Sequence, residues 1–179
     1  MTQTNFEFCL EYIFKIEGGF VNHISDRGGA TNFGITAKTL ADYRGVEKCS
    51  QDDVLKITKN DAAKIYELKY WNTMRLDRIR NKKIALILFD HGVNSGPISS
   101  IKLLQEVLND SFGESLLVDG VLGNKTDASI SKSDGSRLCR KLIQKIQTRY
   151  VAICQKNPEQ LVFLMGWLNR TFWLTDVVS

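Results

Sequence analysis

The sequence has few of the residues that hold metal ions or cross-link distant segments. It contains two histidines and four cysteines, with no Cys-x-x-Cys pair. Neither His23 nor His91 forms a zinc-ligand spacing with a cysteine, so we expect no metal site. We interpret the cysteines as small buried thiols. Disulfides are an alternative for a protein that acts outside the cytoplasm, although the spacing of the cysteines does not indicate them. The cysteines are Cys9, Cys49, Cys139 and Cys154.

The amino terminus lacks the basic segment and the continuous apolar run of a signal peptide, because Glu7, Glu11 and Lys15 interrupt its apolar positions. No stretch approaches the length of a membrane-spanning helix without charges. We therefore expect synthesis in the cytoplasm and no membrane insertion. Any substrate beyond the membrane would then need another factor to let the protein out.

The chain also lacks repeats, low-complexity tracts and long linkers. Its 179 residues, of which 43% are hydrophobic, suffice for one substantial core or two small cores that share an interface. The formal net charge of +4 gives a mild attraction to nucleic acid, anionic lipid and bacterial wall material. The charge alone does not indicate which of these is the partner.

The first half alternates helical and glycine-rich patterns. Residues 5–16 place apolar side chains at helical spacing, and this stripe continues to Glu17. Residues 18–35 contain five glycines and predict a loop with a short irregular hairpin. Helical signals resume at residues 36–43 and, after a capping-box pattern, from Thr58. Residues 82–91 are apolar on nearly every side, which favours a buried helix, although a short buried strand would look similar.

The second half reads as further helices. Pro97 is placed as the first residue of a helix after a clear break, and residues 118–123 are rich in turn formers. Two closing helices are expected over residues 136–155 and 158–169. The fold class is therefore mainly α.

Two acids stand nine positions apart across the glycine-rich segment. Cleavage of a glycosidic bond needs a protonated carboxylic acid for the leaving oxygen and an ionised group or an oriented water for the oxocarbenium-like sugar. Glu17 ends an apolar helix stripe, where burial disfavours the charged form, and this suits a proton donor. Asp26 lies in a polar loop and would stay ionised. Taken alone, however, a glutamate at a helix end is more often a cap, and such loops mostly form turns.

The run from Glu17 to Thr36 resembles the signature of the glycoside hydrolase family 108 muramidases. It reads Glu-Gly-Gly-Phe and then Asp-x-Gly-Gly-x-Thr-Asn-Phe-Gly-Ile-Thr. These enzymes occur as phage endolysins and as wall hydrolases attached to secretion systems. Phage-type lysozymes carry a threonine fifteen positions after the glutamate, where this chain has Asn32 next to Thr31. Either residue could orient the water. His23-Ile24 stands where the family usually has Asp-Pro.

The resemblance extends over most of the chain. Tyr70-Trp71, Asp77 and residues 89–96 resemble the rest of the catalytic region. Leu104-Gln105, residues 118–123 with Thr126, and residues 166–170 resemble the peptidoglycan-binding region that accompanies it. The resemblance implies a catalytic region at 1–96 and a helical peptidoglycan-binding region at 97–179, packed against it.

From this resemblance we expect a lysozyme-like helical fold with a short β-hairpin beside the catalytic cleft. The implied reaction is hydrolysis of the β-1,4 bond between N-acetylmuramic acid and N-acetylglucosamine in peptidoglycan, without a cofactor. Glu17 would be the general acid. The supporting catalytic residues would be Asp26, Thr31 and Asn32. The substrate-binding residues would be Phe20, Thr36, Trp71 and Asn94.

Several of these residues also have a purely structural interpretation. For Trp71 we give about equal weight to a sugar-stacking role and to a place in the core, since aromatic residues at helical spacing are usually buried. Asp119-Gly120 favours an ordinary turn over a wall contact. Asp90-His91 more often closes a helix than forms a second catalytic pair. The basic residues of the first closing helix are usually a solvated face.

Two rival functions come from other classes. A catalytically silent wall-binding or secretion-accessory module would keep the fold, but the intact Glu17 argues against it. A helical nucleic-acid binder would explain the charge but not the glycine-rich loop, so we expect no nucleic acid as partner. The expected site of action is the periplasm or cell wall after export, with dependence on a holin or a secretion system. Cell lysis, protein release and the oligomeric state stay open.

Overall fold

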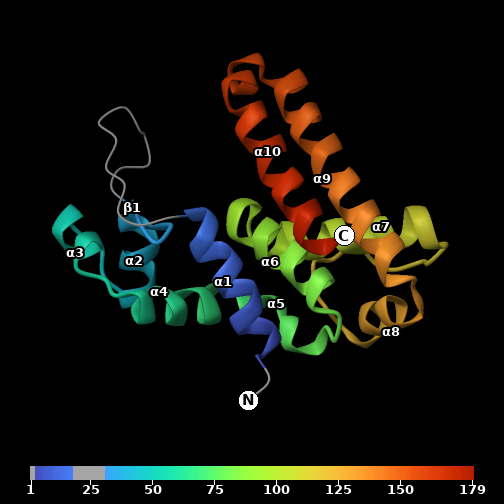
Figure 1. The fold of residues 1–179 in the computed structure, drawn as a ribbon, viewed down its shortest axis with the longest axis horizontal. Helices are drawn as coiled ribbons and strands as arrows, with labels where there is room; N and C mark the ends of the chain where they lie inside the picture. The colour runs from blue at the N-terminus through green and yellow to red at the C-terminus, as the bar shows by residue number, and fades with distance from the viewer. Residues whose placement is uncertain (1–2, 18–30) are drawn as a thin grey trace. The chain divides into compact units, whose positions relative to one another are not determined.

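The computed structural model describes residues 3–17 and 31–179, which form two compact units, Met1–Thr73 and Met74–Ser179 (Figure 1). Both are mainly helical, and the described residues contain one antiparallel two-stranded sheet. The predicted fold class, mainly α with a short hairpin, is confirmed. The structural units and the sequence-based regions 1–96 and 97–179 divide the chain at different places.

The first unit begins with α1 (Asn5–Glu17). Thr4 caps it, because its hydroxyl accepts from the Glu7 amide at 3.2 Å while the Glu7 carboxylate accepts from the Thr4 amide at 2.8 Å. Its buried stripe includes Cys9 and Ile13, both fully buried. Glu17 is the last residue of this helix and is half-buried.

The hairpin that follows consists of β1 (Thr31–Asn32) and β2 (Ile35–Thr36). Thr31 pairs with Thr36, and Asn32 pairs with Ile35. The two turn residues between the strands, Phe33 and Gly34, have φ values of 51° and 75°. Two successive positive φ angles define a tight turn of the kind that matches the twist of the strands.

Capped helices complete this unit. They are α2 (Ala37–Arg44), α3 (Gln51–Leu55), α4 (Lys59–Tyr66), the π-helical turn η1 (Glu67–Trp71) and the start of α5 (Asn72–Met74). The capping box predicted at Thr58 is confirmed, with Asp61 as its partner. A second box, Ser50 with Asp53, starts α3, which the sequence analysis did not predict.

The second unit is built around α6 (Lys82–Ser95), whose residues 84–89 are all at most 1% exposed. The structure therefore confirms the predicted buried helix and not the alternative of a short buried strand. The helix continues past residue 91. Helices from later in the chain pack around it. The unit comprises η2 (Leu76–Arg78), α6, α7 (Pro97–Phe112), α8 (Asn124–Lys132), α9 (Gly135–Lys156), η3 (Pro158–Gln160) and α10 (Leu161–Val178).

The closing helices run side by side as an antiparallel pair (Figure 1). The predicted limits of the last helix, 158–169, were wrong, because a short 3-10 turn comes first and α10 continues to Val178. Its buried stripe runs through Thr171, Leu174 and Val178, beyond the predicted end. None of the helices within residues 3–17 and 31–179 combines the length and the apolar character needed to cross a bilayer.

Candidate functional site

The end of α1 is held against the hairpin turn of the first unit. A methyl group built on Gly34 would lie 2.9 Å from Cγ and 3.0 Å from Oε2 of Glu17, and 2.5 Å from the Tyr66 hydroxyl. That hydroxyl donates to the carbonyl of Phe33 at 3.0 Å. The turn, the catalytic candidate Glu17 and Tyr66 therefore meet at one point, and only glycine fits there.

Aromatic rings surround this meeting point. The Phe14 ring lies 5.8 Å from the Phe33 ring and 6.0 Å from the Tyr66 ring, both edge-on. The ammonium of Lys59 lies 5.0 Å from the centre of the Phe14 ring. Edge-to-face pairs of this kind stabilise by roughly 0.5–1.5 kcal/mol beyond their buried area. They fix the last turn of α1 relative to the hairpin and so position Glu17.

Tyr70 adds a neutral hydroxyl near the same carboxylate. Burial raises the pKa of Tyr70, the carboxylates of Asp42 and Glu17 act in the same direction, and a hydrogen bond with Thr39 opposes them. The phenol therefore stays protonated at neutral pH. The sequence analysis named Tyr70 only within the family resemblance and did not single out Tyr66. It missed their proximity to Glu17, because the pairing with the hairpin turn is not local in sequence.

The three predicted residues of the hairpin occupy different positions. Asn32 is 6% exposed, and its amide donates to the carbonyls of Val54, Leu55 and Ile57 at 3.2, 3.2 and 3.3 Å. Its side chain therefore ties the hairpin to the end of α3 and to Ile57 just after it. Thr31 and Thr36, which pair across the two strands, are half-buried. The Thr36 hydroxyl accepts from the Thr39 amide at 3.1 Å and caps α2.

Of the remaining predicted residues in this half, Phe20 and Asp26 lie outside the described residues. Trp71 is 5% exposed, and its ring centre lies 5.3 Å from that of Phe6. The unit uses this ring in its core, and contact with a sugar stays a prediction.

Asn94 belongs to the second unit, near the end of α6. Its amide donates to the Asp90 carbonyl at 2.7 Å. The Asp90 side chain is buried and accepts from Nε of Arg170 at 2.9 Å, which ties α10 to α6. His91 is 2% exposed, and its Nδ1 has no hydrogen-bond partner among the described residues. Burial, and secondly the charge of Arg149, lowers the pKa of His91 to about 4, so the ring is neutral at pH 7.

The segment around Asp119 is a turn fixed by Gln105. The Gln105 amide donates to Oδ1 of Asp119 at 2.8 Å, and its carbonyl oxygen accepts from the Gly120 amide at 2.9 Å. The hydrogen bond from Gln105, followed by one from the Val121 amide, lowers the pKa of Asp119. This arrangement matches the turn interpretation favoured from the sequence.

Several of the basic side chains of α9 are engaged in contacts within the unit. Arg149 pairs with Glu106 at 2.8 Å, and Lys145 bridges Glu106 and Asp110 at 3.2 and 3.0 Å. The part of the chain that the structure describes contains no group of three or more His, Cys, Asp and Glu side chains arranged to hold a metal ion. Its four cysteines are free thiols, and three of them are buried.

Comparisons with known proteins found a family model for each half of the chain. The family model described as glycosyl hydrolase 108 matches residues 10–96, and the model described as a predicted peptidoglycan domain matches residues 99–172. Among solved structures, SagA of Brucella abortus is similar, at 31% sequence identity and a TM-score of 0.81. That match covers 97% of this chain and 92% of the SagA chain. No curated protein sequence matches significantly.

An identity of 31% over nearly the whole of both chains accompanies the family match and the helical fold with its hairpin. The chain therefore belongs to the glycosyl hydrolase 108 family and is a peptidoglycan hydrolase with a lysozyme-like fold.

Proposed function

We propose that the chain is an N-acetylmuramidase, which hydrolyses the β-1,4 bond between N-acetylmuramic acid and N-acetylglucosamine. The observation that carries this proposal is the position of Glu17, at the end of α1 and against the turn of Phe33 and Gly34. The hydroxyl of Tyr66, which donates to the Phe33 carbonyl, and the protonated phenol of Tyr70 lie near this carboxylate. A single held carboxylic acid is the part that protonates the leaving oxygen.

In the proposed reaction, the Glu17 carboxyl donates its proton to the glycosidic oxygen as the bond to C1 of muramic acid breaks. The positive charge that develops on the sugar is stabilised by Asp26, and water completes the hydrolysis. We assign the orientation of this water to Thr31 rather than Asn32, because the Asn32 amide already donates to backbone carbonyls. The distance between the two carboxyl groups will decide between inversion and retention.

Substrate contacts are assigned to Phe20, Thr36, Trp71 and Asn94. Thr36 lies on the hairpin that also carries the Gly34 turn, and this common hairpin is what supports its assignment. Asn94 lies in the other unit, where its side chain amide has an internal acceptor, and its contribution would come from the carbonyl oxygen.

We further propose that the enzyme acts in the periplasm or the cell wall after export through a holin or a secretion system. Whether the cut serves lysis or protein release follows from the export route. Trapping the protein in the cytoplasm of a host that lacks such a route should leave the wall intact.

The test compares native protein with Glu17→Gln and with Glu11→Gln, which removes an exposed carboxylate from the same helix. Purified peptidoglycan is digested, and new reducing ends are reduced with borohydride and identified. We expect muramic-acid ends from the native protein and from Glu11→Gln. Glu17→Gln should be slower by about 10²–10⁴-fold, because a general acid contributes on that scale.

Circular dichroism establishes that each variant is folded. Reducing glucosamine ends would contradict the assigned bond, and equal rates for both variants would contradict the role of Glu17. A folded native protein that binds several wall types without cutting any would support a silent binding module instead.

A further inference from the structure

The turn between β1 and β2 contains a residue that its own backbone geometry disfavours. Phe33 and Gly34 have φ values of 51° and 75°, so both lie in the left-handed region. Turns with two positive φ angles favour Asn-Gly or Asp-Gly, because a bulky side chain rarely adopts a positive φ. Gly34 follows this preference and Phe33 does not. Contacts from outside the turn must therefore hold Phe33 in its strained conformation.

Tyr66, the last residue of α4, supplies one of these contacts. Its side chain is 1% exposed, and its hydroxyl donates to the Phe33 carbonyl at 3.0 Å. This carbonyl belongs to the peptide group that joins Phe33 to Gly34. The hydrogen bond therefore fixes the peptide plane between the two residues with positive φ.

The sequence Phe-Gly has an unstrained alternative to the observed turn. A type II turn needs a positive φ only at its second central residue, which is the position of Gly34. Such a turn matches the twist of the strands less well and splays them. Relaxation of Phe33 would therefore move the turn as a whole, and the hydroxyl of Tyr66 is placed to accompany the conformation that is observed.

The same hydroxyl lies where the turn meets the proposed acid. A methyl group built on Gly34 would lie 2.5 Å from the Tyr66 hydroxyl and 3.0 Å from Oε2 of Glu17. The hydroxyl and the carboxylate therefore border the same side of Gly34. Any movement of the turn changes the space that the carboxylate occupies.

The ring of Phe33 explains why this position departs from the usual turn sequence. It packs edge-on against the ring of Phe14, with 5.8 Å between the ring centres. Phe14 lies three residues before Glu17, about one turn earlier on α1. An asparagine at position 33 would relieve the backbone but lose this contact with the helix of the acid. Departures from local preference are expected where they serve a functional site.

We infer that Tyr66 is a positioning residue for Glu17, because its hydroxyl holds the strained turn of Phe33 and Gly34 against the acid. The inference rests on the proposed function, in which Glu17 donates the proton. The Tyr66 side chain is buried, so it acts through the turn and not through the substrate. Loss of its hydroxyl should therefore slow the chemical step and leave the apparent affinity for the glycan unchanged.

The experiment is a double-variant cycle of Tyr66→Phe and Phe33→Asn, with soluble glycan strands from peptidoglycan as substrate. Tyr66→Phe removes the hydroxyl and keeps the ring, whose centre lies 6.0 Å from that of Phe14. Phe33→Asn creates the sequence Asn-Gly, which adopts the observed turn without strain. In that background the turn no longer depends on the hydroxyl. Both kcat and KM are measured for all four members of the cycle.

We expect Tyr66→Phe to lower kcat by roughly 10–100-fold in the native background, since a small misplacement of a catalytic group costs on that scale. KM should stay within about twofold. In the Phe33→Asn background the same change should lower kcat by less than about threefold, because the two residues are coupled. An equal loss of kcat in both backgrounds, or an effect on KM alone, would overturn the inference.

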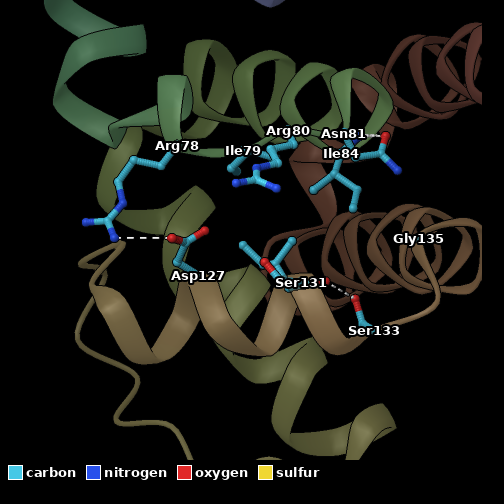
Figure 2. Close-up of a pocket in the computed structure, with 10 residues that line it drawn as sticks. Arg78, Ile79, Arg80, Asn81, Ile84, Asp127, Ser131, Ser133 and Gly135 are labelled. Atoms are coloured by element: carbon cyan, nitrogen blue, oxygen red, sulfur yellow. Dashed lines mark hydrogen bonds and ion pairs between the residues drawn. The ribbon is translucent and has the colours of Figure 1, made fainter.

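Ser133→Ala is the matched control for the loss of one hydroxyl. Ser133 lines a cavity of the second unit, between α8 and the segment that leads into α6 (Figure 2). Its hydroxyl donates to the Ile130 carbonyl at 2.8 Å, so it also joins a side chain to one backbone carbonyl. We expect a lower midpoint of urea unfolding with unchanged kcat and KM. A loss of kcat as large as that of Tyr66→Phe would attribute both effects to general stability and overturn the inference.

Urea unfolding of the four members of the cycle gives a second readout that needs no activity, and circular dichroism establishes that each is folded. The shift of the midpoint caused by Tyr66→Phe should fall to about half or less in the Phe33→Asn background. Equal shifts in the two backgrounds would show that the hydroxyl does not hold the turn. Reducing glucosamine ends, or no cleavage by any member, would instead contradict the proposed function while the midpoints still test the contact with Phe33.

Discussion

The carboxylate of Glu17 lies directly against the backbone of Gly34. A single methyl group on Gly34 would come within 3.0 Å of Oε2 and within 2.5 Å of the Tyr66 hydroxyl. Contacts this short are not tolerated, so an added side chain must displace the glutamate, the tyrosine or the turn. The identity of residue 34 is thus coupled to the position of the proposed acid.

Gly34→Ala should therefore impair catalysis more than folding. The alanine must adopt a φ of 75° and also push on Glu17. Gly45→Ala is the matched control, because Gly45 has a φ of 67° and nothing within 4 Å of the added methyl. We expect each change to lower the free energy of unfolding by about 1–3 kcal/mol through backbone strain. Only Gly34→Ala should reduce the rate of wall cleavage by tenfold or more. Equal rates in the two folded variants would disprove the coupling.

Replacing Asn32 should weaken the fold of the first unit. Asn32→Ala leaves the buried carbonyls of Val54 and Ile57 without this donor, which should cost about 1–3 kcal/mol in urea unfolding. Thr31→Ala should unfold near the native midpoint but slow wall cleavage, in line with the assignment of the water to Thr31. A stable Asn32→Ala variant with slow cleavage would reverse the two assignments.

Removing one charge of the Asp90–Arg170 ion pair should lower the free energy of unfolding strongly. Their side chains are 4% and 14% exposed, so Asp90→Asn leaves a nearly buried guanidinium without its counter-charge. We expect a loss of about 3–5 kcal/mol in urea unfolding. Asp110→Asn, which removes an exposed partner of Lys145, should cost less than about 1 kcal/mol.

A double variant of the same pair tests whether the unpaired charge is the cause of this loss of stability. Asp90→Leu combined with Arg170→Met removes both charges and should recover most of the lost stability. A double variant as unstable as Asp90→Asn would mean that the geometry of the pair, and not the unpaired charge, holds α10 on α6.

His91 should make the fold less stable in mild acid. Its pKa in the folded chain is about 4, below the value of 6.5 for the unfolded chain, because burial disfavours the charged ring. Above pH 6.5 both states are neutral and the fold is unaffected. As the pH falls from 6.5 towards 4, only the unfolded chain gains the proton, and about 2–3 kcal/mol of stability should be lost. Urea unfolding at pH 7.5, 6 and 4.5 measures the slope.

The control for this titration is His91→Gln, which has no proton to gain in that range. The difference between native protein and variant cancels the contribution of the carboxylates, which also titrate at low pH. A native protein that loses no more stability than the variant between pH 7.5 and 4.5 would show that His91 is charged inside the fold.

Local signals in the sequence located most of the helices. The helix expected over residues 5–16 is α1, the capping box at Thr58 starts α4, and Pro97 is the first residue of α7. Each of these depends on neighbours within one or two turns, which the sequence displays directly. The sequence analysis gave no limits for the short helix α8, because only a few of its residues are buried and Gly123 gives it no side-chain cap.

The site could be predicted only in part. Glu17 stands out because a helix stripe ends on it and a long family motif begins with it. The neighbours that hold it, Gly34 and Tyr66, approach it through contacts between segments that are far apart in the chain. The same is true of Arg80 and Ser131, which face one cavity from opposite walls. Spacing in a sequence gives no measure of such distances.

The position of α6 has a consequence for how this chain can evolve. This helix falls within the hydrolase match at 10–96, yet it is the centre of the second unit, where later helices pack around it. A recombination event that exchanged residues 97–179 between relatives would separate those helices from their core and Arg170 from Asp90. We expect the two segments to have been inherited together, with changes on α6 compensated by changes on α9 and α10.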